Sequence, residues 1–424
     1  MRFITDLFKN KEIRNKIIFT LAMLLVYRLG TVIPVPNIDT VKLGAGVTSN
    51  TFIDMMNMLG GGAIQSFSIF SLGVGPYITA SIIIQLLSMD VIPYLTELTK
   101  SGHNGKKQID TITRYLGVVL AYVQSIGLIG IFNSQNQILI SSTPADFFFM
   151  GTIMAAGTMF LLWLGDQITQ KGVGNGLSMI IFAGIVSSLP VTFASTFTTM
   201  TEGNTLSGLI GFGLFVLSYL AIVTLVVFMN GAVRKITIQY TSSTQGRGGQ
   251  TNHLPLMINS ASVVPVIFAG AIMNAPIIAL SWINQNGEIY KFLSKYFVLS
   301  HPVGLVVYAV LIIAFTFFYT NLQVDPEKIA EDFGKNGSYI PGVRPGKDTK
   351  KYISTVLNRI TVLGAIFLTF IALLPNILPM FTSIPSATAL GGTGIIIVVG
   401  VALETVKELK GRTAKRSYQG LFSK

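Results

Sequence analysis

Residues 60–87 combine a short apolar segment, a Gly-Pro break and a strongly apolar segment, and this pattern constrains the fold most. As a helix, residues 60–72 would extend only about 20 Å, too short for a hydrocarbon core of roughly 30 Å. Backbone groups that stop inside a membrane must be buried in protein or line a watery cavity. After Gly73-Val74-Gly75-Pro76 a helix can resume, because proline suits the first helical turn. The pattern predicts a half-helix followed by a separately movable spanning helix.

Composition assigns the chain to the polytopic membrane proteins. Hydrophobic residues make up 50% of the chain and charged residues only 11%, and the mean hydropathy is +0.63. These values lie far from those of soluble domains. Apolar stretches long enough to span a membrane predict an all-α protein with ten transmembrane helices, at about 17–36, 74–90, 115–133, 148–165, 174–190, 207–229, 257–280, 303–322, 356–375 and 391–406.

The basic residues predict the orientation of these helices. Every Lys and Arg except Arg28, Lys42, Lys291 and Lys295 lies in the N-terminal segment, in alternate loops or in the tail. Such a bias places both termini in the cytoplasm. The N-terminal segment lacks a small-residue cleavage site, so we expect a retained first helix. Orientation explains most of the net charge of +12, although a basic face also suits anionic lipids or RNA.

The sequence excludes several kinds of chemistry. His103, His253 and His301 lie in or beside expected loops, and neither HExxH nor GxSxG occurs. We therefore expect no metal site, no cofactor and no catalytic centre. Acidic residues lie in loops or at expected membrane edges, which weighs against an ion-coupled transporter. The Gly-rich residues 171–176 lack a preceding strand and a GKS/T ending, so a turn that starts a helix is favoured over a phosphate loop.

Aliphatic and weakly polar side chains therefore dominate the expected spans. A narrow hydrophobic ring can close a passage by excluding water without any charge. Such a passage suits an unfolded, partly apolar peptide. A ten-helix secondary transporter built from inverted repeats is the alternative, and a membrane enzyme is a more distant one.

Several motifs together are specific: residues 73–87 (GVGPYITASIIIQLL), 157–165 (GTMFLLWLG), 174–176 (GNG), 253–256 (HLPL), 264–268 (VPVIF), 317–320 (FFYT) and 341–346 (PGVRPG). With them the chain resembles, nearly from end to end, the SecY/Sec61-alpha family of protein-conducting channel subunits. The resemblance implies two inverted five-helix halves, residues 1–195 and 196–424, around an hourglass pore.

The resemblance also implies a pore ring and a plug. The ring residues would be Val74, Ile78, Leu177, Ile181, Ile267 and Ile397. Val74 and Ile78, like Leu177 and Ile181, are four residues apart and would share a helix face. The half-helix would be the plug beneath the ring, made of Gly60, Gly61, Gly62, Ala63, Ile64, Gln65, Ser66, Phe67, Ser68, Ile69, Phe70, Ser71 and Leu72. Its small and hydroxyl residues would ease its transfer into water.

Lateral release of signal sequences would need a gate between helices. The resemblance gives Thr79, Gln124, Asn274 and Ala275 as gate residues. Weak interhelical hydrogen bonds of the first three could close the gate and still let it open. Simple helix packing explains the polar residues among them equally well. Two expected cytoplasmic loops, 230–256 and 323–355, would dock the ribosome or the SecA motor.

Arg344 is the first docking candidate, because a guanidinium suits phosphate or carboxylate partners. Arg247 is the second, but its loop carries few basic residues, and a solvated loop without RNA contacts is an equal reading.

The resemblance implies a passive channel in the bacterial cell membrane rather than an enzyme. Secretory preproteins and nascent membrane proteins would be its substrates, and SecA or the ribosome would supply the driving force. SecE-like and SecG-like subunits and anionic lipids would be further partners. The sequence leaves open whether the channel is the housekeeping or an accessory one.

Overall fold

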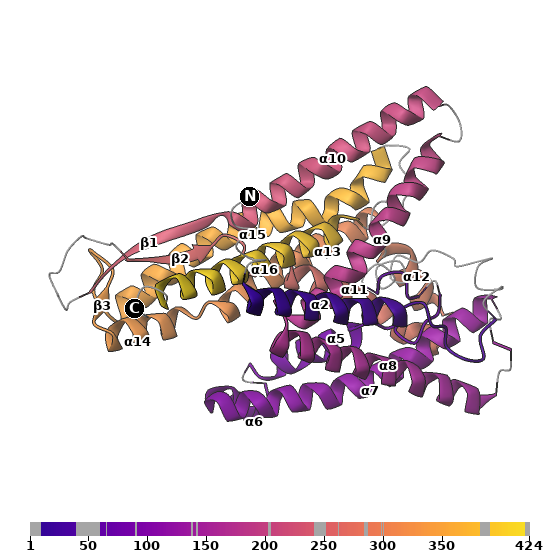
Figure 1. Cartoon of the computed structure of the whole chain (residues 1–424), viewed down its shortest axis with the longest axis horizontal. Coiled ribbons are helices and arrows are strands. Elements are labelled where there is room, and N and C mark those ends of the chain that lie inside the picture. Colours follow the sequence, from indigo (N-terminus) through magenta and orange to yellow (C-terminus); the bar gives the residue numbers. More distant parts are fainter. Residues whose placement is uncertain are drawn as a thin grey trace. The chain divides into compact units, whose positions relative to one another are not determined.

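The chain forms a predominantly helical structure with one small sheet (Figure 1). The computed structural model describes residues 10–39, 60–64, 66–89, 91–136, 139–140, 143–201, 205–240, 252–261, 263–283, 287–297, 299, 301–381 and 391–419. The elements are α2 (Lys11–Gly30), α5 (Gly75–Leu87), α6 (Pro93–Lys100), α7 (Gly102–Asn136), α8 (Pro144–Lys171), α9 (Gly176–Thr201), α10 (Thr205–Gly231), β1 (Val233–Tyr240), β2 (Asn252–Met257), α11 (Val264–Ile283), α12 (Glu288–Tyr296), α13 (Pro302–Gln323), α14 (Pro326–Lys335), β3 (Ser338–Tyr339), α15 (Lys347–Phe381) and α16 (Gly391–Gln419).

The chain divides into two compact units. Unit 1 comprises Met1–Leu209, Asn274–Leu293 and Val401–Lys424, and unit 2 comprises Ile210–Met273 and Ser294–Gly400. In unit 1, α7 packs against α5, α6 and α8, while α2 packs against α8 and α9. In unit 2, α15 packs against α13 and α14. The division into inverted halves at residue 195 stays a prediction.

Prolines start many of the helices. Pro76, Pro93, Pro144, Pro302 and Pro326 each occupy one of the first two positions of their helix. At that place the missing N–H has no intrahelical partner to lose, and the fixed φ suits the helix. Side-chain caps add to this effect at the start of α8, where the capping residue and the third helical residue bond reciprocally. The expected restart of a helix beside Pro76 is confirmed.

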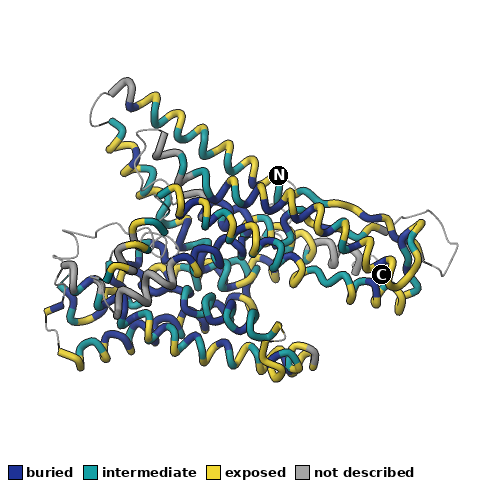
Figure 2. The backbone as a smooth tube through the Cα atoms, turned by 180° about the vertical axis from the view of Figure 1, so that it is seen from behind, coloured by how far each residue is buried: buried dark blue, intermediate teal, exposed yellow. Residues whose placement is uncertain are grey.

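All ten apolar stretches expected to span a membrane overlap helices: α2, α5, α7, α8, α9, α10, α11, α13, α15 and α16. Among the described residues, 6 helices are long and apolar enough to cross a membrane. Residues Gly75–Leu87 and Val264–Met273 form shorter apolar helices. The all-α membrane class is therefore confirmed, and the total of ten spans stays a prediction. Along α10, exposed residues recur over most of the helix, as expected of a lipid-facing element (Figure 2).

Two boundaries in the first part of the chain differ from expectation. The first helix ends at Gly30 rather than near residue 36. Residues 60–64 and 66–72 form successive turns, so the predicted half-helix is wrong. Both differences have one cause: residues 31–35 and the turn segment bond to each other. Val35 N donates to Phe67 O at 3.0 Å, and Ile69 N donates to Ile33 O at 3.1 Å.

The small sheet joins two segments that we expected to be loops. Strands β1 and β2 form an antiparallel hairpin, with Val233 opposite Met257 and Ile238 opposite Asn252. Strand β3 pairs antiparallel with the end of β1, which makes the order β2-β1-β3. The described parts of the two expected loops, residues 230–240 and 252–256 in one and 323–355 in the other, are thus joined by this sheet within unit 2, which also contains α14. The alternative of a flexible solvated loop around Arg247 concerns residues 239–250, of which 241–250 lie outside the described residues.

Candidate functional site

Local features of the predicted plug, residues 60–72 without the undescribed Gln65, are compatible with its turns. Gly61 and Gly62 have φ angles of +69° and +86°, a conformation that glycine adopts without strain. A Cβ on Gly61 would lie 2.8 Å from Gly184 Cα of α9, so the close approach also requires glycine. Ser71 Oγ donates to Ala63 O at 3.0 Å. Such hydroxyl bonds to backbone carbonyls compete with helix formation.

Several bulky residues of this plug segment belong to a hydrophobic core in unit 1. Ile64 and Phe67 are fully buried, and the Phe67 ring meets Phe132 of α7 edge to face at 5.3 Å. The same cluster includes residues of the chain after α2, of α7 and of α8: Val35, Ile38, Ala121, Leu128, Ile129, Met150, Met154 and Ala155. Burial of the bulky side chains therefore stabilises this position by several kcal/mol.

A groove on the outside of unit 1 reaches the plug segment. The groove holds about 520 Å³ and is lined by α2, α8 and the plug residues Ile69 and Phe70. Gly30 and Gly157 make this approach possible, because a Cβ on either would overlap Phe70 or the carbonyl of Ile69. The lining is apolar throughout, as expected for a face turned to hydrocarbon.

Four of the six predicted ring residues lie in unit 1. Val74 precedes α5 as its N-cap, and Ile78 N donates to Val74 O at 3.1 Å. Leu177 and Ile181 lie one turn apart at the start of α9. Ile267 on α11 and Ile397 on α16 belong to unit 2, so the complete ring stays a prediction.

The turn before α9 is the one that the Gly-rich sequence predicts. Gly174 has a φ of +80°, and Asn175 Oδ1 accepts the N–H of Leu177 at 3.1 Å. A Cβ on Gly176 would lie 1.8 Å from Gly165 O, so the two glycines let α9 start directly against α8. From α16, Glu408 Oε2 accepts the N–H of Gly174 at 3.0 Å. The turn sets the position of Leu177.

The gate residues are described only in part. Thr79 Oγ1 donates to Gly75 O within α5 at 3.1 Å, and Gln124 is half-buried on α7, which packs against α5. Asn274 and Ala275 lie within α11, but their side chains are outside the described part of the structure. A polar contact across the gate therefore stays a prediction.

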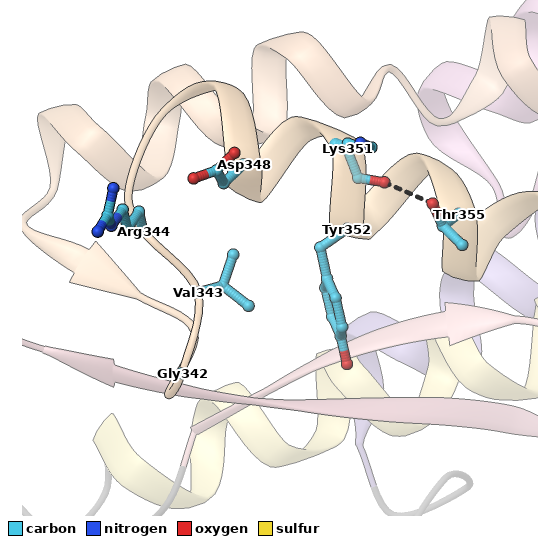
Figure 3. Close-up of a pocket in the computed structure, with 7 residues that line it drawn as sticks. All are labelled: Gly342, Val343, Arg344, Asp348, Lys351, Tyr352 and Thr355. Atoms are coloured by element: carbon cyan, nitrogen blue, oxygen red, sulfur yellow. Dashed lines mark hydrogen bonds between the residues drawn. The ribbon is translucent and has the colours of Figure 1, made fainter.

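Arg344 lies beside a hollow of about 440 Å³ at the start of α15 (Figure 3). The loop before α15 supplies Gly342, Val343 and Arg344, and the first turns of α15 supply Asp348, Lys351, Tyr352 and Thr355. We call these seven residues the Arg344 pocket. Arg247 lies outside the described residues.

A small core beneath the sheet fixes the loop that carries Arg344. Val343 packs against a buried cluster from the hairpin, the residue after β3 and α15: Ile236, Leu256, Ile340, Ile353 and Ile360. Thr349 is 1% exposed, and its hydroxyl donates to the Arg344 carbonyl at 2.9 Å. The backbone is therefore held, while the Arg344 side chain stays exposed.

The charged side chains around this pocket differ in whether they form ion pairs. Lys350 Nζ pairs with Glu327 of α14 at 2.8 Å. Among the described residues, no ion pair involves Arg344 or Lys351. Both charges are exposed beside Tyr352, so they can meet an anionic group of a partner.

Arg344 was named from the sequence, but its pocket neighbours Asp348, Lys351 and Tyr352 were not. A signal was present, because Asp348, Lys351, Tyr352 and Thr355 follow the spacing of one helix face. Tyr27 and Arg28, which bond to the plug segment, were also missed as contacts of that segment. Their partners lie 33 residues away in the chain, so no local pattern could show them.

Comparisons with known proteins agree on one family. A family model described as SecY matches residues 68–406. The chain is 46% identical to the protein translocase subunit SecY of Bacillus subtilis (strain 168), over 99% of both chains. It is 43% identical to the protein translocase subunit SecY of Staphylococcus carnosus, over 98% of both chains.

Solved structures with the same fold have lower sequence identity. One, described as the structure of a protein conducting channel, matches with a TM-score of 0.68 at 20% identity, over 93% of this chain and 91% of that one. Another, described as Sec61 in the canine ribosome-channel complex from the endoplasmic reticulum, has a TM-score of 0.65 at 19% identity, with the same coverage. A third matches with a TM-score of 0.66, and its description says that the plug domain of the SecY protein stabilises the closed state of the translocation channel.

Proposed function

The chain belongs to the SecY family of protein translocase subunits, and from this premise we propose how its two candidate sites serve a protein-conducting channel. The observation that carries the function is the full-length match to relatives named translocase subunits. A multi-pass channel subunit, and not an enzyme, is the class that the match supports. The transporter alternative has no comparable support.

The plug segment is the closure of the resting channel. It follows α2 in sequence and ends two residues before Val74, the first predicted ring residue. Its burial in unit 1 supports a closed state in which the segment blocks the path. An unfolded secretory chain passes when the segment leaves, and signal sequences or membrane segments leave sideways past Thr79 and Gln124.

The sheet and the Arg344 pocket are the docking platform. Strands β1, β2 and β3 and the start of α15 share a small core and present Arg344 and Lys351 to solvent. SecA and the ribosome are the partners we assign to this surface. A ribosome-bound Sec61 channel with the same fold supports the second assignment.

The remaining partners follow from the membrane setting. A SecE-like subunit braces the channel, and a SecG-like subunit accompanies it in the bacterial cell membrane. Both termini lie in the cytoplasm, because the basic residues gather on that side. Anionic lipids bind the same basic face.

Protease protection of a signal-bearing preprotein tests this function. Proteoliposomes would contain this chain, its SecE-like partner and cognate SecA with ATP. We expect protection that requires both the motor and the signal, and that falls at least tenfold with Arg344→Glu, because the reversed charge repels an anionic partner. Lys335→Glu is the matched control, since this exposed lysine lies on α14 and does not line the pocket.

Either of two results would contradict the proposal. Absence of protection with a folded complex and an active motor would remove the channel function, and solute uptake would then be measured. Equal losses with Arg344→Glu and Lys335→Glu would remove the docking role of the pocket and leave the channel function standing.

A further inference from the structure

The C-terminal end of α2 makes the polar contacts that hold the plug segment. Tyr27 Oη donates to Gly60 O at 2.9 Å, and Arg28 Nη1 donates to Gly61 O at 2.7 Å. Tyr27 is only 1% exposed. Its hydroxyl and the Gly60 carbonyl therefore have little access to water that could replace their bond.

The residues just after α2 continue this set of contacts. Ser66 Oγ donates to Thr31 O at 2.9 Å. Phe67 and Ile69 bond through their backbones to Val35 and Ile33, and Pro34 and Ser68 form an antiparallel bridge. These bonds all end on residues 27–35, so a single short stretch of chain holds the segment at points from Gly60 to Ile69.

Helix α8 contributes apolar contacts instead. The Phe70 ring stacks on Phe160 of α8 at 5.8 Å and on Tyr27 of α2 at 6.4 Å, with interplanar angles of 9° and 11°. Aromatic pairs are favourable in both offset-stacked and edge-to-face arrangements, so these contacts depend less on one geometry than a hydrogen bond does. Tyr27 is the residue that joins the two sets, since its ring stacks and its hydroxyl bonds.

When the plug segment leaves this position, its apolar contacts and its hydrogen bonds are affected differently. Apolar side chains that leave the core can meet lipid, a signal sequence or a passing chain. The Tyr27 hydroxyl stays on α2 and loses its acceptor inside an apolar site, which is unfavourable. The bond therefore favours the resting state specifically.

We propose that the C-terminal end of α2 holds the plug segment in its resting position, with Tyr27 and Arg28 as the positioning residues. Their two hydrogen bonds to the segment, which we call the catch, set how often the resting channel opens. This inference rests on the proposed function of residues 60–72 as a plug. It assigns to α2 a role in gating, apart from any role in the pore ring, the lateral gate or the docking platform.

A reporter thiol on the plug segment tests the catch. The chain has no cysteine, so Ser71→Cys provides a unique thiol at a buried position of similar size. The measurement is the labelling rate by a membrane-impermeant maleimide in proteoliposomes containing the channel and its SecE-like partner, without motor. Ion leak through the same vesicles is the second readout.

We expect Tyr27→Phe to raise the labelling rate about tenfold and to raise the leak, because one buried hydrogen bond is lost from the resting state. Arg28→Lys, which keeps the charge and loses the guanidinium geometry, should give a smaller increase in the same direction. Tyr115→Phe is the matched control, since Tyr115 lies on α7 with 71% of its surface exposed. It should change neither readout.

A purely structural role for Tyr27 would give a different pattern. In channels held open by a stalled preprotein, the catch is already released, so the labelling rates of Tyr27→Phe and the parent should converge. Persistence of the difference there, or an unchanged resting rate in folded Tyr27→Phe, would overturn the inference. If Tyr27→Phe does not fold, Arg28→Lys and Ser66→Ala decide by the same readout, and unchanged rates in both would overturn it.

Failure of the catch and failure of the proposed function remain distinguishable. Unchanged labelling together with normal preprotein protection in the parent would remove the catch alone. Absence of preprotein protection in the parent would remove the channel function, whatever the labelling rates.

Discussion

The plug segment and the docking platform both contain non-helical structure in a mainly helical membrane protein, yet they are stabilised in opposite ways. The plug segment is buried: its bulky side chains fill the core of unit 1, and its backbone bonds to residues 27–35. The platform is exposed: a small core under the hairpin holds its backbone, and its charged side chains point to solvent. The segment that we propose to move is held by apolar packing and by hydrogen bonds to residues 27–35, and the platform that we propose to dock leaves Arg344 and Lys351 exposed and, among the described residues, outside any ion pair.

The largest effect should come from emptying the core around the plug segment. Phe67→Ala should lower the free energy of unfolding of unit 1 by about 3–5 kcal/mol, because Phe67 is fully buried. Thermal unfolding of the purified complex in detergent measures it. Phe149→Ala, at a position 56% exposed on α8, is the control and should have little effect. Equal shifts for both would mean that the segment is not a core element.

The next effect should be confined to the platform. Ile353→Ala should destabilise the platform core by about 2–4 kcal/mol, since Ile353 is fully buried beneath the sheet. Hydrogen exchange should then quicken in β1 and β2 and stay unchanged at Phe67 and Ile69. Ile366→Ala, at a position 60% exposed on the same helix, serves as the control. Faster exchange in both regions would show that they unfold as one unit.

A smaller effect should depend on salt. Lys351→Gln should weaken the binding of SecA to proteoliposomes about two- to fivefold at low salt, because an exposed charge contributes little. Near 1 M salt, where the screening length is about 3 Å, the difference from the parent should vanish. Labelling of Ser71→Cys should not follow salt in this way. A salt-independent loss with Lys351→Gln would point to altered folding of the pocket.

The smallest effect should come from a second Tyr→Phe substitution, the same chemical change as Tyr27→Phe but at the surface of the platform. Tyr339→Phe removes the 3.0 Å hydrogen bond from Tyr339 Oη to Gln239 Oε1, which lies at the surface. Water can replace this bond, so the stability of the platform should change by less than about 0.5 kcal/mol. Platform unfolding by hydrogen exchange measures it. An effect as large as that of Tyr27→Phe on the plug would contradict the distinction between buried and exposed hydroxyls.

The two sites also differ in how far they could be predicted. Arg344 was found because a short motif carries it, and its neighbours Lys351 and Tyr352 follow a helical spacing that is visible in the sequence. The half-helix over residues 60–72 was wrong, although its glycines and serines were recognised. Those residue types permit a helix or turns, and the choice depended on the Tyr27 hydroxyl and on backbone carbonyls and amides of residues 31–35.

The sequence by itself determined the membrane class, the positions of the apolar helices and several of their starts. Hydrophobic runs and a proline in the first helical turn act locally, so each can be recognised within about 20 residues of sequence. Only the tertiary structure decided that residues 60–72 fold as turns against α2, and that β1 and β3 join segments 100 residues apart. Backbone hydrogen bonds between distant segments depend on which groups meet in space, and every residue offers the same N–H and C=O groups to that choice.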